Sequence, residues 1–269
     1  MRRPLFLEGE AGVGKTEVAK VLARWLGGEL LRLQCYDGID VSQAVYEWDY
    51  PRQLLHLRAV EAVGGAARDS VEDELYSERF LVKRPLLRAI ASAGDTAAAP
   101  PVLLIDELDR ADDEFEAYLL EILADYTVTV PELGTFRAER PPVAVVTSNR
   151  TREVHDALKR RCLYHWVEHP DFEREVRIVE LKVPGVAPAL ARQVAAAVGE
   201  LRTMGLYKVP GVAETIDWAL ALQTLGVVDL DATSIDRTLG SVLKYREDAE
   251  RARRHGLSEL VRAAVERQG

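Results

Sequence analysis

The order of apolar and polar positions predicts two regions of different architecture. Up to residue 169, short runs of consecutive apolar residues, which indicate strands buried on both faces, alternate with stretches of helical spacing. These strands are expected at residues 4–7, 30–34, 102–105, 143–147 and 164–167. Beyond residue 169 only helical spacing continues, at about 172–181, 187–204, 212–225 and 234–254. The pattern predicts an α/β parallel-sheet core over residues 1–169 and a smaller all-α domain over residues 170–269.

Further elements are expected between these strands. Tyr46, Trp48 and Tyr50 alternate in a short stretch that ends at Pro51, and such aromatic residues are more typical of a core than of a contact surface. The others are a helix at 52–63, a flexible segment at 64–69, an acidic stretch through Glu78, a helix at 84–92, a loop at 94–101, a helix at 112–124, a β-hairpin at 126–137 and a short helix at 156–162.

The first predicted strand leads directly into a glycine-rich motif. The residues are Gly9, Glu10, Ala11, Gly12, Val13, Gly14, Lys15 and Thr16, which match G-x-x-x-x-G-K-[ST] and are followed by a predicted helix. Together with Glu17 they are the candidate nucleotide-binding residues. Glycines allow backbone N–H groups to surround an anion, and the helix N-terminus adds partial positive charge. Lys15 is therefore expected to reach the β- and γ-phosphates of a nucleotide, and the Thr16 hydroxyl to hold Mg²⁺. A chance match in a glycine-rich turn is the alternative.

Polar residues end two of the buried strands. Asp106 and Glu107 follow the run at 102–105, at the strand end where open α/β sheets bind ligands. Asp106 is expected to hold Mg²⁺, and Glu107 to polarise the water that attacks a γ-phosphate. The alternative is an acidic helix cap, because more acidic residues follow from Asp109 to Glu114. Asn149 ends the strand at 143–147, where it either caps a helix or orients the attacking water.

Composition narrows the class of protein. Lys+Arg 35 against Asp+Glu 44 gives a net charge of -9, which opposes non-specific nucleic-acid binding. The two cysteines, Cys35 and Cys162, form no C-x-x-C pair and are expected to be buried thiols in a reducing compartment. No apolar run approaches a membrane span, and the apolar segment after Arg3 is too short for a signal peptide. A cytoplasmic protein without a membrane partner is expected.

One candidate metal motif needs separate treatment. His165 and His169 form the pattern H-x-x-E-H, which binds zinc when both imidazoles lie on one face of a helix. Here the run is predicted to be a strand that Pro170 stops, so the two rings are not expected to converge. A metal site is not predicted there.

The motifs together resemble the AAA+ ATPase module. The glycine-rich motif, residues 102–107, Asn149 and Arg160-Arg161 follow in the order of that module, and the resemblance covers nearly the whole chain. The sequence is most similar to the MoxR family in PLFLEGEAGVGKTEVAK, in VLLIDELDRADDEFEAYLLEIL, in the hairpin before Asn149 and in RRC after it. LQCYDGIDVSQAVYEW and PGVAETIDWALAL are similar to a branch found with carbon monoxide dehydrogenase and other molybdenum hydroxylases.

The resemblance implies a role for each motif. Asp106 would support the Mg²⁺ of bound ATP, Glu107 would be the catalytic base, and Asn149 would be sensor 1. Arg161, with Arg160 as second choice, would be the arginine finger that completes the site of a neighbouring subunit. It also implies a homo-oligomeric ring, usually a hexamer, that acts as a chaperone in metalloenzyme maturation with a partner carrying a von Willebrand factor A domain.

The sequence departs from the family in two places. MoxR-like chains carry a few tens of residues before the P-loop, including a helix that packs on the adenine, and here the first strand starts at residue 4. This indicates either a misassigned start or weakened adenine binding. The helical part also lacks the sensor 2 arginine expected near residues 210–213, which predicts slow hydrolysis.

Three other functions compete with a remodelling ATPase. An AAA+ nucleic-acid motor or loader would need a basic channel or an appended DNA-binding module, and the acidic composition argues against it. A nucleotide-gated scaffold with little turnover agrees with the missing arginine and disagrees with the presence of Glu107 and Asn149. A small-molecule P-loop kinase would leave Asn149, the arginine pair and the helical domain without a role.

Overall fold

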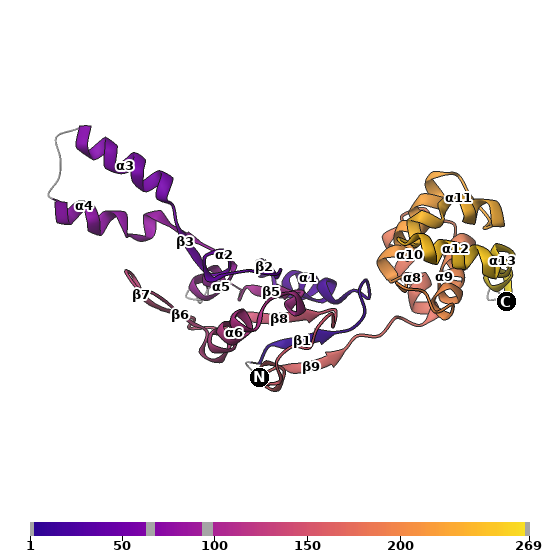
Figure 1. Cartoon of the computed structure of the whole chain (residues 1–269), viewed down its shortest axis with the longest axis horizontal. Coiled ribbons are helices and arrows are strands. Elements are labelled where there is room, and N and C mark those ends of the chain that lie inside the picture. The colour runs from indigo at the N-terminus through magenta and orange to yellow at the C-terminus, as the bar shows by residue number, and fades with distance from the viewer. Residues whose placement is uncertain (1–2, 63–67, 93–98, 267–269) are drawn as a thin grey trace. The chain divides into compact units, whose positions relative to one another are not determined.

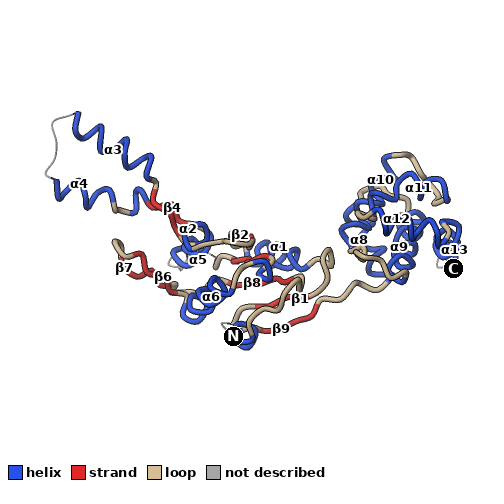
Figure 2. The backbone as a smooth tube through the Cα atoms, in the orientation of Figure 1, coloured by secondary structure: helices blue, strands red, loops and turns tan. Residues whose placement is uncertain are grey.

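The computed structural model describes residues 3–62, 68–92 and 99–266 (Figures 1 and 2). The chain forms two compact units. The first unit contains Met1–Gly9 and Lys15–Trp166, and the second contains Glu10–Gly14 and Val167–Gly269. Within the described ranges no helix is long and apolar enough to cross a membrane.

A five-stranded sheet forms the centre of the first unit. Its order is β2-β5-β8-β1-β9, and every neighbouring pair is parallel. The strands are β1 (Leu5–Glu8), β2 (Leu30–Gln34), β5 (Val102–Asp106), β8 (Val143–Ser148) and β9 (Leu163–Trp166). All five coincide with the predicted strands, and β5 is buried along its whole length. The predicted parallel α/β core is therefore confirmed.

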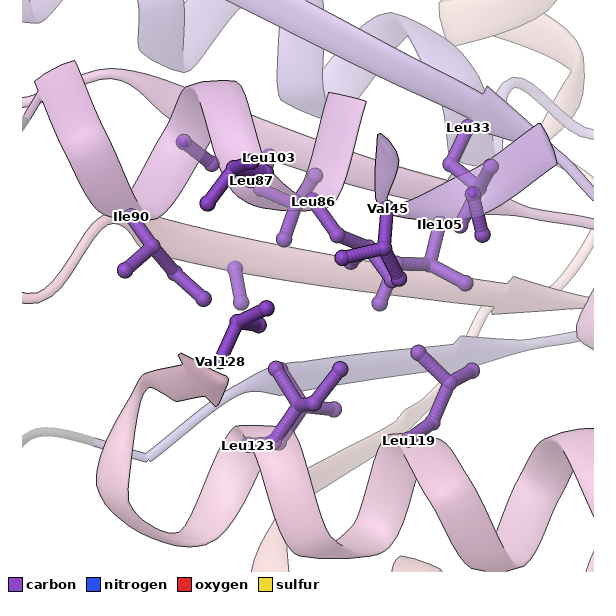
Figure 3. Packing of buried hydrophobic residues seen from close by; sticks show 14 of the residues in the cluster. Leu33, Val45, Leu86, Leu87, Ile90, Leu103, Ile105, Leu119, Leu123 and Val128 are labelled. Carbon is purple, nitrogen blue, oxygen red and sulfur yellow. The ribbon is translucent and has the colours of Figure 1, made fainter. Parts of the chain in front are cut away.

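Alternate residues of the strands pack against helices on opposite faces of this sheet. Leu103 and Ile105 face a core with residues of α5 (Pro85–Ala91) and α6 (Asp113–Asp125), and Figure 3 shows these side chains pointing toward one another. On the other face α1 (Lys15–Leu26) packs against β5, β2 and β8. Because the sheet is covered on both faces, its strands contain the uninterrupted apolar runs seen in the sequence.

An insertion between β2 and α5 differs from the sequence prediction. It comprises α2 (Val41–Ala44), an antiparallel pair of β3 (Tyr46–Trp48) with β4 (Leu81–Lys83), and the helices α3 (Tyr50–Ala62), α4 (Arg68–Leu75) and η1 (Glu78–Phe80). Figure 1 shows α3 and α4 side by side, away from the main sheet. The sequence predicted α3 and missed α2, α4 and β4, because these are short elements whose partners lie far along the chain.

Two predicted segments of the first unit, one in the insertion and one between α5 and β5, lie partly outside the described residues. They are the flexible segment at 64–69, of which residues 68–69 belong to α4, and the loop at 94–101, of which only residues 99–101 are described.

The first unit also contains a hairpin and two short helices. The predicted hairpin is present as β6 (Thr127–Val130) and β7 (Gly134–Arg137), with Thr129 paired to Thr135. A 3₁₀ helix, η3 (Leu108–Arg110), follows β5, and α7 (Asp156–Arg161) precedes β9. The hairpin prediction is confirmed.

The second unit is helical, as predicted, around a core that includes the fully buried Trp218. Its helices are α8 (Phe172–Lys182), α9 (Pro188–Thr203), α10 (Val212–Thr224), α11 (Ala232–Val242), α12 (Arg246–His255) and α13 (Leu257–Glu266). The single helix predicted at 234–254 is wrong. Leu243 leaves the helix in extended conformation, and the Lys244 ammonium caps α11 by donating to the Ser241 carbonyl oxygen at 2.7 Å. Gly240 lies within α11, and no glycine or proline stands between Ser241 and Arg254 to mark the break.

Candidate active site

The glycine-rich motif connects β1 to α1 and has the backbone geometry of a phosphate-binding loop. Gly12 and Gly14 have φ angles of +78° and +97°, which side chains of L-residues rarely tolerate. Lys15 is buried, and its Nζ donates to the carbonyl oxygen of Gly9 at 2.8 Å, so that the ammonium lies across the start of the loop. Glu17 lies on an exposed part of α1, where its carboxylate pairs with Lys20 at 2.5 Å.

Thr16 and Asp106 come together from α1 and β5. The Thr16 hydroxyl donates to Asp106 Oδ1 at 3.2 Å, and Thr147 Oγ1 on β8 donates to the same oxygen at 2.5 Å. The Asp106 side chain is only 4% exposed, and Arg32 Nη2 on β2 lies 2.6 Å from its Oδ2. A hydroxyl beside a carboxylate is the oxygen donor set that Mg²⁺ prefers, so these residues fit the predicted metal.

Glu107 and Asn149 also lie together, because β5 and β8 are neighbours in the sheet. Asn149 Nδ2 donates to Glu107 Oε1 at 3.3 Å, and Gln34 Nε2 on β2 donates to Oε2 at 3.0 Å. Glu107 has φ 56°, a left-handed conformation that is costly for a residue with a side chain. Such strain often occurs at functional positions. The structure therefore brings Thr16 to Asp106 and Asn149 to Glu107 at the carboxyl ends of β5 and β8.

Sequence reasoning treated Asp109 only as part of an acidic helix cap, and the structure gives it a different position. Asp109 is 2% exposed and accepts hydrogen bonds from the backbone N–H groups of Asn149 (3.1 Å) and Thr151 (2.8 Å). It therefore fixes the loop that presents Asn149 to Glu107. The helix cap is instead Asp112, which accepts from Phe115 N at 2.8 Å at the start of α6.

The contacts of Arg32, Gln34 and Thr147 were also missed. Each lies at or near the end of a strand next to β5, but polar residues at such positions are common and the sequence does not give their side-chain partners.

The arginine pair lies at the end of α7 and is held by its backbone. The Arg3 guanidinium caps this helix by donating to the carbonyl oxygens of Arg160 (2.5 Å), Arg161 (3.0 Å) and Cys162 (2.9 Å). Both arginine residues are exposed. Arg161 Nη1 donates to the carbonyl oxygen of Leu120 at 2.8 Å, whereas Arg160 donates no side-chain hydrogen bond within the described residues.

The cysteines and the paired histidines do not provide a second reactive centre. Both thiols are buried, and burial together with the nearby carboxylates raises the pKa of Cys35 to about 12, which keeps that thiol protonated near neutral pH. His165 lies on β9, as the strand prediction required, and His169 lies beyond its end. The helical geometry of a zinc H-x-x-E-H motif is therefore not present.

The fold and the site define a P-loop ATPase of the AAA class. The chain belongs to the AAA domain family of the dynein-related subfamily, whose model matches residues 4–162. ATP binding follows from this membership, and comparison with the curated proteins gives no match.

Comparison with solved structures gives matches that include the following two proteins. A single-residue mutant of RuvB from Thermotoga maritima is 14% identical with a TM-score of 0.50, covering 88% of this chain and 62% of that chain. The chain thus spans less than two thirds of that RuvB structure. A putative ATPase from Cytophaga hutchinsonii is 14% identical with a TM-score of 0.44, covering 99% of this chain and 85% of that chain. At this identity the likeness to RuvB shows the fold alone.

Replacement of Lys15 tests the phosphate-binding loop. Lys15→Ala is expected to weaken ATP binding about 100-fold, because a charge-assisted contact is worth up to roughly 3 kcal/mol. Isothermal titration calorimetry measures the affinity. Lys20→Ala is the matched control, because Lys20 is a half-exposed lysine on the same helix. Equal affinities of the two variants would contradict the assignment of the loop.

Proposed function

We propose that the chain is a MoxR-like ATPase that hydrolyses Mg·ATP and remodels a client metalloenzyme during its maturation. Thr16 and Asp106 would hold the Mg²⁺, Glu107 would act as general base, and Asn149 would orient the attacking water. The 3.3 Å contact between Asn149 and Glu107 supports these last two roles, since it places an amide beside the base.

One observation carries the proposal that the active form is an assembly. Leu163 N, at the start of β9, donates to the carbonyl oxygen of Pro4, and the Arg3 side chain beside it holds the end of α7. The backbone of the arginine pair is therefore anchored at the amino end of β1, while the phosphate-binding loop follows its carboxyl end. The side chain of Lys159, the residue before the pair, reaches Glu8 at that carboxyl end, with 3.3 Å between Nζ and Oε1. A four-residue strand separates these ends by about 13 Å. We propose that these exposed arginines serve the site of a neighbouring subunit in a homo-oligomeric ring, and that this ring is a hexamer.

We further propose the molybdenum hydroxylase class as client, with a partner that carries a von Willebrand factor A domain. This part rests on the resemblance of LQCYDGIDVSQAVYEW and PGVAETIDWALAL to the corresponding branch of MoxR proteins. The surfaces proposed for contact are the β6–β7 hairpin and the insertion with α3. On α3 the side chains of Tyr50, Leu54 and Leu55 are 63%, 52% and 69% exposed. Co-expression with such a hydroxylase should raise its cofactor occupancy, and unchanged occupancy would contradict this client.

A nucleotide-gated scaffold is the second candidate function. Three donors hold the Glu107 carboxylate: Gln34, Asn149 and Arg110, whose Nη1 lies 3.3 Å from Oε2. These contacts hold the carboxylate in one position between its donors. Residues 210–213 also provide no sensor 2 arginine. This candidate predicts ATP binding and ring formation with almost no turnover.

Steady-state ATPase activity, measured alongside native mass with and without Mg·ATP, distinguishes these functions. We expect ATP-dependent oligomers whose turnover per subunit rises with protein concentration, because each site needs an arginine from its neighbour. Added DNA is expected to leave the rate unchanged. Assembly without hydrolysis would support the scaffold, and strong stimulation by DNA would support a nucleic-acid motor. A monomer with full turnover would contradict the trans arginine.

A further inference from the structure

The carboxylate of Asp106 has no acceptor position left among its described neighbours. An ionised carboxylate offers about four lone-pair sites. Oδ1 accepts from Thr147 at 2.5 Å and from Thr16 at 3.2 Å. Oδ2 accepts from Arg32 Nη2 at 2.6 Å and Nε at 3.1 Å, with Thr16 at 3.4 Å as a shared contact. A metal ion, or a water bound to one, therefore needs one of these donors to leave.

Arg32 is the donor with a route away from the carboxylate. Its side chain is 54% exposed, whereas that of Asp106 is 4% exposed. Arg32 and Gln34 are two residues apart on β2 and so lie on the same side of the sheet, next to Asp106 through the parallel pairing of β2 with β5. Arg32 Nη2 also donates to Gln34 Oε1 at 2.5 Å, and this contact remains available when Asp106 is released.

Charge also favours Arg32, and not the two hydroxyl donors, as the group that leaves Asp106 when a metal ion binds. Arg32 carries a full positive charge, and a divalent cation beside the same oxygen would repel it. The Thr147 hydroxyl is fixed because it also accepts from the backbone N–H of Glu107 at 2.9 Å. The Thr16 hydroxyl can donate to Asp106 while its oxygen lone pair binds the metal.

We propose that Arg32 is a positioning residue that occupies the metal side of Asp106 and withdraws when Mg·ATP binds. It supplies positive charge to a buried carboxylate in the absence of metal, and the affinity for Mg²⁺ is lowered by the competition of two cations for Oδ2. Nucleotide binding thereby moves a charged side chain of β2 from Asp106 toward Gln34. The inference rests on the proposed role of Thr16 and Asp106 as the Mg²⁺ site.

The test compares ATP affinity in EDTA with ATP affinity in saturating Mg²⁺, both by calorimetry. The ratio of the two dissociation constants reports how much more tightly the metal binds to enzyme-bound ATP than to free ATP. In Arg32→Met this ratio is expected to be about tenfold higher than in the parent chain, since a partly exposed competing charge has gone. Arg32→Lys keeps the charge, so its ratio should stay near that of the parent.

Arg110→Met is the matched control, because Arg110 is 60% exposed and contacts Glu107 instead of Asp106. Its ratio is expected to change less than about twofold, since solvent screens exposed charges. A ratio in Arg32→Met that is unchanged or lower, with ATP binding in EDTA intact, would overturn the proposal, as would an equal rise in Arg110→Met. Arg32→Gln carries the same expectation and replaces Arg32→Met if that variant does not fold. A parent chain that fails to bind ATP in either buffer would instead overturn the proposed function.

Discussion

Glu107→Gln is expected to bind Mg·ATP with the affinity of the parent chain and to lose about 10³-fold in turnover, since a general base contributes roughly 10²–10⁴-fold. The amide keeps the size of the carboxylate and one acceptor oxygen, so it loses the hydrogen bonds accepted by the other oxygen, and it cannot accept the proton of the attacking water. The left-handed backbone at Glu107 directs its side chain between Gln34 and Asn149, and glutamine at this position preserves that path. Calorimetry and phosphate release measure the two quantities separately.

The control for this variant is Glu114→Gln. Glu114 is an exposed residue in the first turn of α6, and its replacement removes the same charge from the same acidic segment. We expect it to hydrolyse ATP at the parent rate. Normal turnover in Glu107→Gln would show that another group activates the water. An equal loss of turnover in Glu107→Gln and Glu114→Gln would mean that the rate depends on the net charge of this segment and that Glu107 is not a specific base.

The central sheet could be predicted because its strands are buried on both faces. Leu103 and Ile105 pack on one side and Leu104 lies between them on the other, so β5 contains no polar residue before Asp106. Parallel strands also place their carboxyl ends at one edge of the sheet. The position of Asp106, Glu107 and Asn149 at one edge of the sheet followed from those two facts together, whereas the contact of Asn149 with Glu107 depends on β5 and β8 being neighbours.

The polar contacts around Asp106 and Glu107 could not be predicted in the same way. Whether Arg32 contacts Asp106 depends on β2 lying next to β5 in a particular register. The local pattern of apolar and polar residues predicts neither the neighbouring strand nor the register. Asp109 looked like one more acidic residue of a helix cap, because its partners, the N–H groups after β8, lie 40 and 42 positions along the chain. Long-range hydrogen bonds leave no periodic signal.

Replacement of the arginine finger is expected to have the second large effect on turnover. The side-chain contacts of Arg160 and Arg161 change which of the two we expect to be that finger. Arg161 was the first choice for the finger, yet its guanidinium donates to the Leu120 carbonyl oxygen of its own subunit. Arg160 has no such contact within the described residues and is exposed. Arg160→Ala is therefore expected to bind ATP normally and to lose on the order of 10³-fold in turnover, the lower end of the range for arginine fingers. Arg161→Ala is expected to lose far less.

Mixing variants tests whether Arg160 acts on a neighbouring subunit. A Lys15→Ala subunit keeps Arg160 and an Arg160→Ala subunit keeps its phosphate-binding loop, so a mixed ring contains some interfaces with both intact groups. Turnover should rise above that of either variant alone, because a trans arginine restores the lost transition-state charge. Its upper limit is about the parent turnover multiplied by the fraction of interfaces that contain both intact groups. Native mass establishes that mixed rings form. No recovery in mixed rings would mean that the arginine acts within its own chain.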